Sequence, residues 1–341
     1  MANWSELQYD VLVHVAKRLN LIEDYLNFAA VCKPWRRAAT KNNFNSDLPR
    51  VPWLMLAEEE NNKEEGGEAN TCRKFFSLYN GMILKKRIPN ARGKRCMESM
   101  GWLIAAGKDE GEITLLHPFS GVQIQLPHPN TTKGYNCQLT VDPWTFFHKA
   151  VLSASPSKTS DYVLMVIEAN NKYLSFWRPG DLRWTRIMKE DNPALHRDVV
   201  YFNGKFYAVQ WLGHVLVCDV TGAEPMAQKV ARLPLDQIGD ELVYKLDIAA
   251  GKLTETKELG DRAIFFGANA SLSVQASQFP GIKPNCIYFT DDRYDTYGYY
   301  VEGGGLDMGV YNLADDTIQP HYKGVSLSPL TPPTWVTPTL C

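Results

Sequence analysis

Residues 113–127, ITLLHPFSGVQIQLP, decide the fold. The first part, residues 113–116, is a short run of β-branched and aliphatic side chains, and residues 122–126 alternate between apolar and polar side chains. Ser120-Gly121 stands between the two runs, and glycine accepts the positive φ angles that tight hairpin turns require. The stretch therefore predicts two antiparallel strands joined by a turn.

The same arrangement recurs five times along the chain. The paired runs are 75–79 with 82–84, 173–177 with 183–187, 215–219 with 229–234, 242–246 with 253–256, and 309–313 with 317–320. Six hairpins in about 290 residues have a mean spacing of about 48 residues, which is close to the repeat of a four-stranded propeller blade. We predict a mainly β protein with a degenerate β-propeller of about six blades. A pair of β-sandwiches is the structural alternative.

The first 42 residues have a different pattern, which is helical. Leu12, Val15 and Leu19 repeat at the spacing of one helix face. Asp24 is expected to cap a second short helix, and Pro34 suits the first turn of a third, where its missing N–H has no partner to lose. Three helices this short cannot bury a core alone, so they must pack against a partner, the rest of the chain, or both.

The composition is that of an ordinary globular protein. The chain has 341 residues, 45% apolar residues and a formal net charge of −2. Near-neutrality argues against a protein that coats nucleic acid, because phosphate binding needs an excess of basic residues. Apolar runs such as 162–167 are long enough for a strand and too short to span a bilayer. We therefore expect neither nucleic acid nor membrane as a partner.

The N-terminus and the cysteines indicate an intracellular protein. Residues 1–6 lack the basic and apolar regions of a secretory signal. The seven cysteines are widely spaced and form no C-x-x-C pair, so neither a disulfide framework nor a zinc knuckle is predicted. Cys218 and Cys286 fall inside apolar strand runs, where a thiol behaves as a small apolar side chain. We expect the protein in the cytoplasm, the nucleus or both.

Two neighbouring segments carry opposite charge. Residues 58–68 contain six acidic residues and one basic residue, which predicts a solvated loop. Residues 73–95 contain eight basic residues and no acidic residue. This second segment is either a basic hairpin beside the acidic loop or a site for nuclear import or an anionic ligand.

The N-terminal block resembles an F-box. The resemblance rests on residues 4–12, WSELQYDVL, and residues 31–36, VCKPWR. Gln8 stands where F-boxes usually have proline. An F-box binds a Skp-type adaptor through an apolar face, and the resemblance implies a set of side chains that supply this face and the small internal core. The set is Leu7, Leu12, Val15, Leu19, Val31 and Trp35.

The rest of the chain resembles the plant F-box-associated domain of unknown function 295, a kelch-like propeller. The matching stretches are 115–121 with 124–127, 265–274 with 279–292, 307–313 and 333–338. The resemblance implies an F-box at 1–45, a propeller at 46–341, and a substrate-recognition subunit of a Skp/cullin/F-box ubiquitin ligase. Such a subunit binds the adaptor, through it the cullin, and a protein substrate, and it carries out no catalysis. The substrate and the loops that bind it are not assigned.

Motifs of catalysis and metal binding are missing from the sequence. No nucleotide-binding glycine motif, nucleophile elbow or zinc-protease motif is present. The seven histidines lack the spacing of metal ligands, and Asp291, Asp292 and Asp295 lack the glycine and distal glutamate of a calcium loop. We expect no cofactor. A propeller enzyme or small-ligand-binding protein, and an F-box protein that acts outside ubiquitination, are the alternative functions.

Overall fold

The computed structural model describes most of the chain, in eleven segments. They are residues 4–19, 21–44, 50–58, 71–107, 111–132, 146–168, 172–187, 195–222, 224–233, 243–291 and 304–340. The predicted acidic loop at 58–68 lies outside these segments except for Glu58.

The N-terminal domain consists of short helices, as predicted. They are η1 (Trp4–Glu6), α1 (Tyr9–Ala16), α2 (Ile22–Ala30), α3 (Lys33–Ala38) and η2 (Lys41–Asn43). Pro34 lies in the first turn of α3, as predicted. The prediction that Asp24 caps the second helix is wrong, because α2 begins two residues earlier and Leu21 is its N-cap. Asp24 instead lies in the first turn, where its charge is favourable to the helix dipole.

In the described residues, twenty-three strands follow in six sheets, of which five have four or five strands. Blade 1 contains β23 (Thr334–Val336), β1 (Trp53–Met55), β2 (Cys72–Phe76) and β3 (Ile83–Arg87). Blade 2 contains β4 (Lys94–Ser99), β5 (Trp102–Gly107), β6 (Ile113–Leu116) and β7 (Gln123–Gln125). Blade 3 contains β8 (Phe147–Leu152), β9 (Leu164–Glu168), β10 (Tyr173–Trp177) and β11 (Thr185–Arg186).

The remaining strands complete the ring. Blade 4 contains β12 (His196–Phe202), β13 (Lys205–Gln210), β14 (His214–Asp219) and β15 (Met226–Arg232). Blade 5 has the order β19 (Leu272–Gln275), β18 (Arg262–Phe266), β20 (Cys286–Phe289), β21 (Gly309–Asn312) and β22 (Thr317–Gln319). The sixth sheet is a hairpin of β16 (Tyr244–Asp247) and β17 (Lys252–Glu255) between blades 4 and 5.

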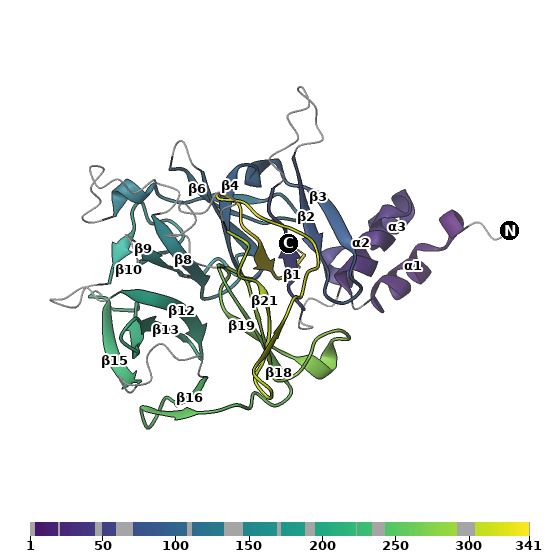
Figure 1. Ribbon diagram of the computed structural model, residues 1–341. Helices are drawn as coiled ribbons and strands as arrows, with labels where there is room; N and C mark the ends of the chain where they lie inside the picture. The colour runs from purple at the N-terminus through teal and green to yellow at the C-terminus, as the bar shows by residue number, and fades with distance from the viewer. Residues whose placement is uncertain are drawn as a thin grey trace.

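The five blades surround a common axis, and the F-box helices lie beside blade 1, away from blade 4 (Figure 1). Strands β23, β4, β8 and β12 each end their sheet, and neighbours in this series contact one another, so these strands line the axis. The predicted propeller after a helical N-terminal domain is confirmed. Against about six predicted blades, the described residues form five full blades and the additional hairpin.

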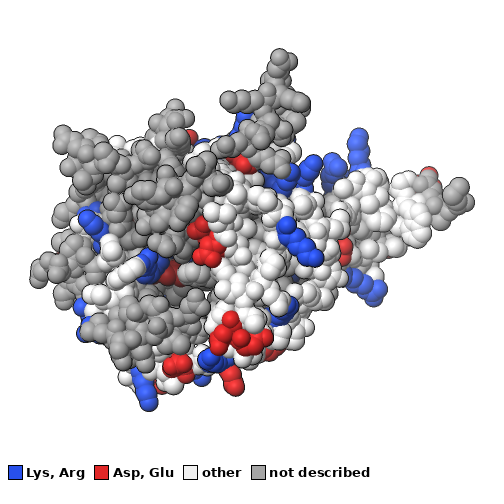
Figure 2. Space-filling model, in the orientation of Figure 1, with Lys and Arg blue, Asp and Glu red and all other residues white. Residues whose placement is uncertain are grey.

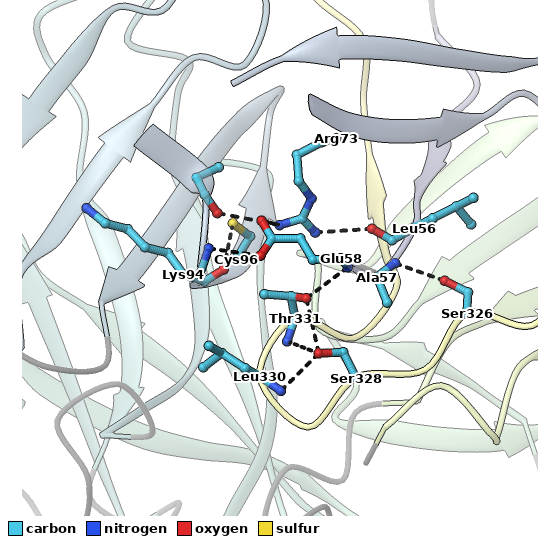
Figure 3. A network of polar contacts seen from close by, with 12 residues as sticks. Leu56, Ala57, Glu58, Arg73, Lys94, Cys96, Ser326, Ser328, Leu330 and Thr331 are labelled. Carbon is cyan, nitrogen blue, oxygen red and sulfur yellow. Dashed lines mark hydrogen bonds and ion pairs between the residues drawn. The ribbon is translucent and has the colours of Figure 1, made fainter. Parts of the chain in front are cut away.

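The C-terminal strand closes the ring. β23 pairs antiparallel with β1 in the register Trp53↔Val336 and Met55↔Thr334, so blade 1 is built from both ends of the chain. A polar network extends this closure (Figure 3). The backbone N–H of Ala57 donates to Ser326 Oγ at 2.9 Å, and that of Glu58 donates to Thr331 Oγ1 at 3.0 Å.

Glu58 also connects the closing segment to blade 2. Its carboxylate accepts hydrogen bonds from the buried guanidinium of Arg73 at 3.1 Å and from the Gly93 N–H at 2.9 Å. Because Arg73 additionally donates to the Leu56 carbonyl at 3.2 Å, its charge is compensated within the fold. One carboxylate thus joins the start of blade 1, strand β2 and the entry to blade 2.

The strand directions define two ends of the ring. Successive strands of blades 1–4 are antiparallel, so the β2–β3, β4–β5, β6–β7 and β8–β9 turns lie at one end. Residues of the β2–β3 and β8–β9 turns contact the F-box, so we call this the F-box end. The β5–β6, β9–β10 and β13–β14 turns lie at the opposite end, called the far end.

Side chains between the blades form the core. Trp102, Trp177 and Trp184 are at most 3% exposed and lie in the cluster between blades 2 and 3. Cys218 and Cys286 are buried in β14 and β20, as predicted. Arg95 is fully buried and donates to the carbonyls of Phe147 and His148, which ties blade 2 to blade 3.

Candidate functional site

The F-box helices pack one face inward and expose another. Leu12 and Ala16 of α1 are buried one turn apart, while Val11 and Val15 occupy the i, i+4 positions on the solvent side of the same helix. Helix α3 contacts both α1 and α2, so the three helices form a single small bundle. The arrangement leaves apolar side chains in water, which marks a surface that another protein can cover.

The structure divides the six predicted adaptor-binding residues into an inner and an outer group. Leu12 is 1% exposed, and Leu7, Leu19 and Trp35 pack partly buried against the same core. Val15 and Val31 are 38% and 57% exposed and point away from it. The inner residues hold the bundle together, and the outer residues are accessible to a partner.

Further exposed apolar residues in this region were not singled out from the sequence. They are Trp4, Tyr9 and Val11, with exposed fractions of 66%, 55% and 42%. The Trp4 carbonyl accepts a hydrogen bond from Trp35 Nε1 at 3.0 Å, which fixes η1 beside α3. The i, i+4 spacing of Val11 and Val15 was the signal in the sequence that could have identified this outer face.

The F-box shares its core with the propeller. One buried cluster contains Leu12 and Phe28 of the helices together with Trp53, Phe75 and Val336 of blade 1. At the start of α2, Glu23 Oε1 accepts a hydrogen bond from Trp53 Nε1 at 2.7 Å and another from Ser77 Oγ at 3.1 Å. The helices are therefore attached to blade 1 by both apolar packing and hydrogen bonds.

A second contact joins the F-box to blade 3. Lys41 Nζ, in η2, donates to the carbonyl of Ser157 in the β8–β9 turn at 3.0 Å. The Arg50 guanidinium lies 4.5 Å from the ring centroid of Phe44, at the passage from the F-box to β1. Contacts to blades 1 and 3 restrict the rotation of the F-box about the linker.

The propeller axis holds a buried charged cluster. Lys149 Nζ of β8 contacts Asp198 Oδ1 of β12 at 2.9 Å and donates to the Gly267 carbonyl at 2.8 Å. Ser271 Oγ donates to Asp198 Oδ2 at 2.7 Å, and the Ala270 N–H donates to the Glu98 carbonyl at 2.6 Å. The segment 267–271 of blade 5 thus contacts blades 2, 3 and 4. Because both charges have partners within the fold, the cluster serves to hold the blades together.

Basic side chains gather along one edge of the molecule. Figure 2 shows a row of Lys and Arg side chains between β3 and the helices. Strand β3, with Lys85, Lys86 and Arg87, is the outer strand of blade 1, and lysine on an edge strand discourages pairing with other chains. The predicted basic hairpin is confirmed, since β2 and β3 pair directly. Nuclear import or binding of an anionic ligand by this segment stays a prediction.

The described residues hold neither a cluster of metal ligands nor a membrane-spanning helix. Within the part of the chain that the structure describes, no three His, Cys, Asp or Glu side chains come together as a metal site would require. Over the same residues, none of the helices has both the length and the apolar character that crossing a membrane demands.

Comparison with known proteins identifies both parts of the chain. The F-box domain family matches residues 4–47. The family described as the KIB1-4 beta-propeller matches residues 75–242 and 235–312. Similar proteins from Arabidopsis thaliana include the F-box/kelch-repeat protein At1g57790, 24% identical over 92% of this chain and 89% of its own length. The putative F-box protein At1g65770 is 26% identical over 94% of this chain and 96% of its own length.

Solved structures resemble the chain only weakly. A chain of the Nidogen/Laminin complex covers 84% of this chain and 98% of its own length, with 9% identity and a TM-score of 0.38. A likeness of this size has no bearing on function. The two family matches and the observed order of helices and blades agree, and the chain belongs to the KIB1-4 beta-propeller family, with an F-box domain at its N-terminus.

Proposed function

We propose that this protein is the substrate-recognition subunit of a Skp/cullin/F-box ubiquitin ligase. The observation that carries the proposal is the arrangement of the F-box. Its outer face exposes Val11, Val15 and Val31, and its inner face packs against a propeller in a shared core. The F-box would bind a Skp-type adaptor and through it the cullin, and the propeller would bind a protein substrate. The protein itself would hold no cofactor and catalyse no reaction.

The finer assignments belong to the same proposal. The F-box would occupy residues 1–45 and the propeller residues 46–341, the latter being of the kind called domain of unknown function 295. The protein would act inside the cell, in the cytoplasm, the nucleus or both, where ubiquitin ligases meet their substrates. The outer residues Val15 and Val31 would contact the adaptor, and the inner residues Leu7, Leu12, Leu19 and Trp35 would support them.

The attachment of the F-box supports a mechanism based on proximity. A receptor of this kind raises the local concentration of a substrate near a catalytic subunit, and a rigid connection makes this more effective than a flexible one. The contacts Glu23–Trp53 and Lys41–Ser157 hold the helices at two separate blades. The direction in which a bound substrate is presented would therefore be set by the fold.

The experiment is co-purification of the full-length protein with a Skp-type adaptor. Val15→Asp places a charge on the outer face without entering the core, and we expect it to abolish or strongly reduce adaptor recovery. Ile318→Asp is the matched control, because Ile318 is an exposed residue of blade 5, at 58%. Leu12→Asp would test folding instead, since Leu12 is buried. Failure of the wild-type protein to recover the adaptor would contradict the proposal.

A further inference from the structure

The chain continues past β23 into a short segment at the F-box end of the ring. Strand β2 ends at the F-box end, β1 is antiparallel to β2, and β23 is antiparallel to β1, so β23 ends there as well. Residues 337–340 follow β23 directly, and we call them the C-terminal strap. Pro338 is buried and the other three residues are half-buried, so the strap is packed against the rest of the chain.

Blade 2 binds one side of the strap through two fully buried side chains. The Thr337 N–H donates to Glu98 Oε1 at 3.2 Å. Because burial lowers the pKa of His117 to about 4, its ring is neutral, and Nδ1 accepts a hydrogen bond from the Ser120 N–H at 3.2 Å. The ring proton is therefore on Nε2, which donates to Thr339 Oγ1 at 3.0 Å. Blade 2 thus holds two alternate residues of the strap.

The other side of the strap meets the F-box. Leu340 packs against the buried cluster that contains Leu12 of α1 and Phe28 of α2. Pro338 lines the same narrow cleft as Ile22, the first residue of α2. The strap therefore lies between the F-box helices and blade 2, and it contacts both.

The strap fits closely against the β4–β5 turn. Gly101 in this turn has φ +83°, a conformation that favours glycine. A Cβ atom at Gly101 would lie 2.8 Å from Thr339 Cγ2 and 3.0 Å from the Thr337 carbonyl oxygen, and it would overlap Thr339 Oγ1. Ordinary contacts between carbon atoms are about 3.5–4.0 Å. A side chain at position 101 must therefore displace the strap or the turn.

The strap adds a third attachment to the F-box. Glu23 ties the helices to blade 1, and Lys41 ties them to blade 3. Blade 2 lies between these two blades, since β4 contacts both β23 and β8. A rigid body held at two points can rotate about the line that joins them, and a third point outside that line stops the rotation. Because blades 1, 2 and 3 are arranged around the axis and not along a line, the strap supplies such a point (Figure 1).

We propose that the C-terminal strap is a positioning device, which sets the orientation of the F-box relative to the propeller by linking the helices to blade 2. Without it, the F-box would rotate about the line through its contacts to blades 1 and 3. Because the strap continues β23, the orientation of the F-box is also linked energetically to closure of the ring. The proposal goes beyond the proposed function, since it holds whatever partners the F-box and the propeller bind.

The test measures a distance distribution in the full-length protein by pulsed electron spin resonance. Spin labels are attached to unnatural amino acids that replace Lys17, at the end of α1, and Lys205, in β13 of blade 4, both of which are exposed. We expect one narrow distribution in the otherwise unchanged protein. Gly101→Ala should make it roughly twofold broader or more, because the F-box then moves as a body held at two points.

Gly121→Ala is the matched control in the same blade. Gly121 lies in the β6–β7 turn, also at the F-box end, and its φ of +77° gives alanine the same backbone strain as at Gly101. A Cβ atom at Gly121 would meet nothing within 4 Å. The control should therefore keep the narrow distribution. Equal broadening by the two substitutions would assign the effect to strain in the turns of blade 2 and overturn the proposal.

Two further variants keep the test decisive if Gly101→Ala fails to fold. Removal of residues 337–341 leaves β23 and its pairing with β1 in place, and it should broaden the distribution as Gly101→Ala does. Thr339→Val keeps the shape of the side chain but removes the acceptor of His117, so it should broaden the distribution less. Thermal unfolding in a single transition would show that the propeller is folded in each variant. A folded protein without residues 337–341 that keeps the narrow distribution would overturn the proposal.

Discussion

The pKa of Glu98 is shifted by its buried position between strand β4 and the segment that follows β23. It is fully buried on β4, where Oε1 accepts hydrogen bonds from the backbone N–H groups of Gly101 at 2.7 Å and Thr337 at 3.2 Å. Oε2 has no hydrogen-bond partner among the described residues. Burial raises the pKa of this carboxyl from an ordinary 4.5 to about 7, against the opposing effect of the two N–H donors.

This pKa makes stability depend on pH in a defined direction. Between pH 4.5 and 7 the folded protein retains a proton on Glu98 that the unfolded chain releases, so its contribution to the free energy of unfolding falls as pH rises, by about 3 kcal/mol across the window. Urea unfolding would measure the free energy of unfolding of wild type and Glu98→Gln at two pH values. We expect the wild type to be more stable relative to Glu98→Gln at pH 5 than at pH 7.5.

Buried histidines change the free energy of unfolding with pH in the direction opposite to Glu98. The effect of Glu98 must therefore be measured as the difference between wild type and Glu98→Gln. Burial lowers the pKa of His117 to about 4 and that of His148 to about 3, so both favour the folded state as pH rises toward 6.5. Subtracting the variant from the wild type removes their contribution. A difference between wild type and Glu98→Gln that does not change with pH would refute the prediction.

At the scale of elements, the start of helix α2 determines how the F-box is attached. Glu23→Ala would leave the Trp53 Nε1–H, on a tryptophan that is 3% exposed, without its acceptor, at a cost of roughly 1–3 kcal/mol. Thermal and urea unfolding would measure the loss. Asp24→Ala is the control, because Asp24 shares the first turn of α2 and is exposed. Equal destabilisation by the two variants would show that the helix dipole, and not the junction, is responsible.

Elements also show what the sequence could predict. Hairpins such as residues 113–127 were found because strand runs and turn residues are local, and β6 and β7 follow them closely. The parallel pairing of β18 with β20 is not predicted by the sequence. It joins residues 23 positions apart (Ala263↔Cys286), and the connection between them contains another strand, β19. The capping preference of Asp24 predicts a later start for α2 than the observed start at Ile22. The packing of the buried Ile22 side chain outweighs that preference.

The candidate site was predictable only in part for a related reason. Helical spacing places Leu12, Val15 and Leu19 near one another, yet it does not say which side of a helix faces the propeller. In the structure, Leu12 is buried in the cluster that also contains Trp53 and Phe75, while Val15 is exposed. The exposure of Trp211 could not be predicted from the sequence either, because it depends on how the blades are arranged around the axis.

For the whole molecule, ring closure by β23 should control cooperative folding. The closing segment contributes Ser326 and Thr331 to the polar network, β23 to blade 1, and Thr339 Oγ1 to a contact with His117 Nε2 at 3.0 Å. We expect a truncated chain, residues 1–325, to lose the single sharp thermal transition of the full protein. A synthetic peptide of residues 326–341 should restore it in proportion to its concentration.

The peptide offers its own control. Trp335 is fully buried and lies edge-on to Phe265 and Tyr288, with distances between ring centroids of 5.0 and 6.4 Å. A peptide with Trp335→Ala should therefore restore much less of the sharp thermal transition. A truncated chain that unfolds like the full protein without any peptide would show that closure by β23 is dispensable.

Closure by the last strand also has a consequence for the order of events on the ribosome. Strand β1 is made early, but its partner β23 emerges only about 280 residues later, which at typical elongation rates takes roughly 15–60 s. During that interval one edge of β1 has no native neighbour, and the F-box core lacks Val336. The F-box helices therefore lack part of the core that supports them until β23 has been synthesised and has joined blade 1.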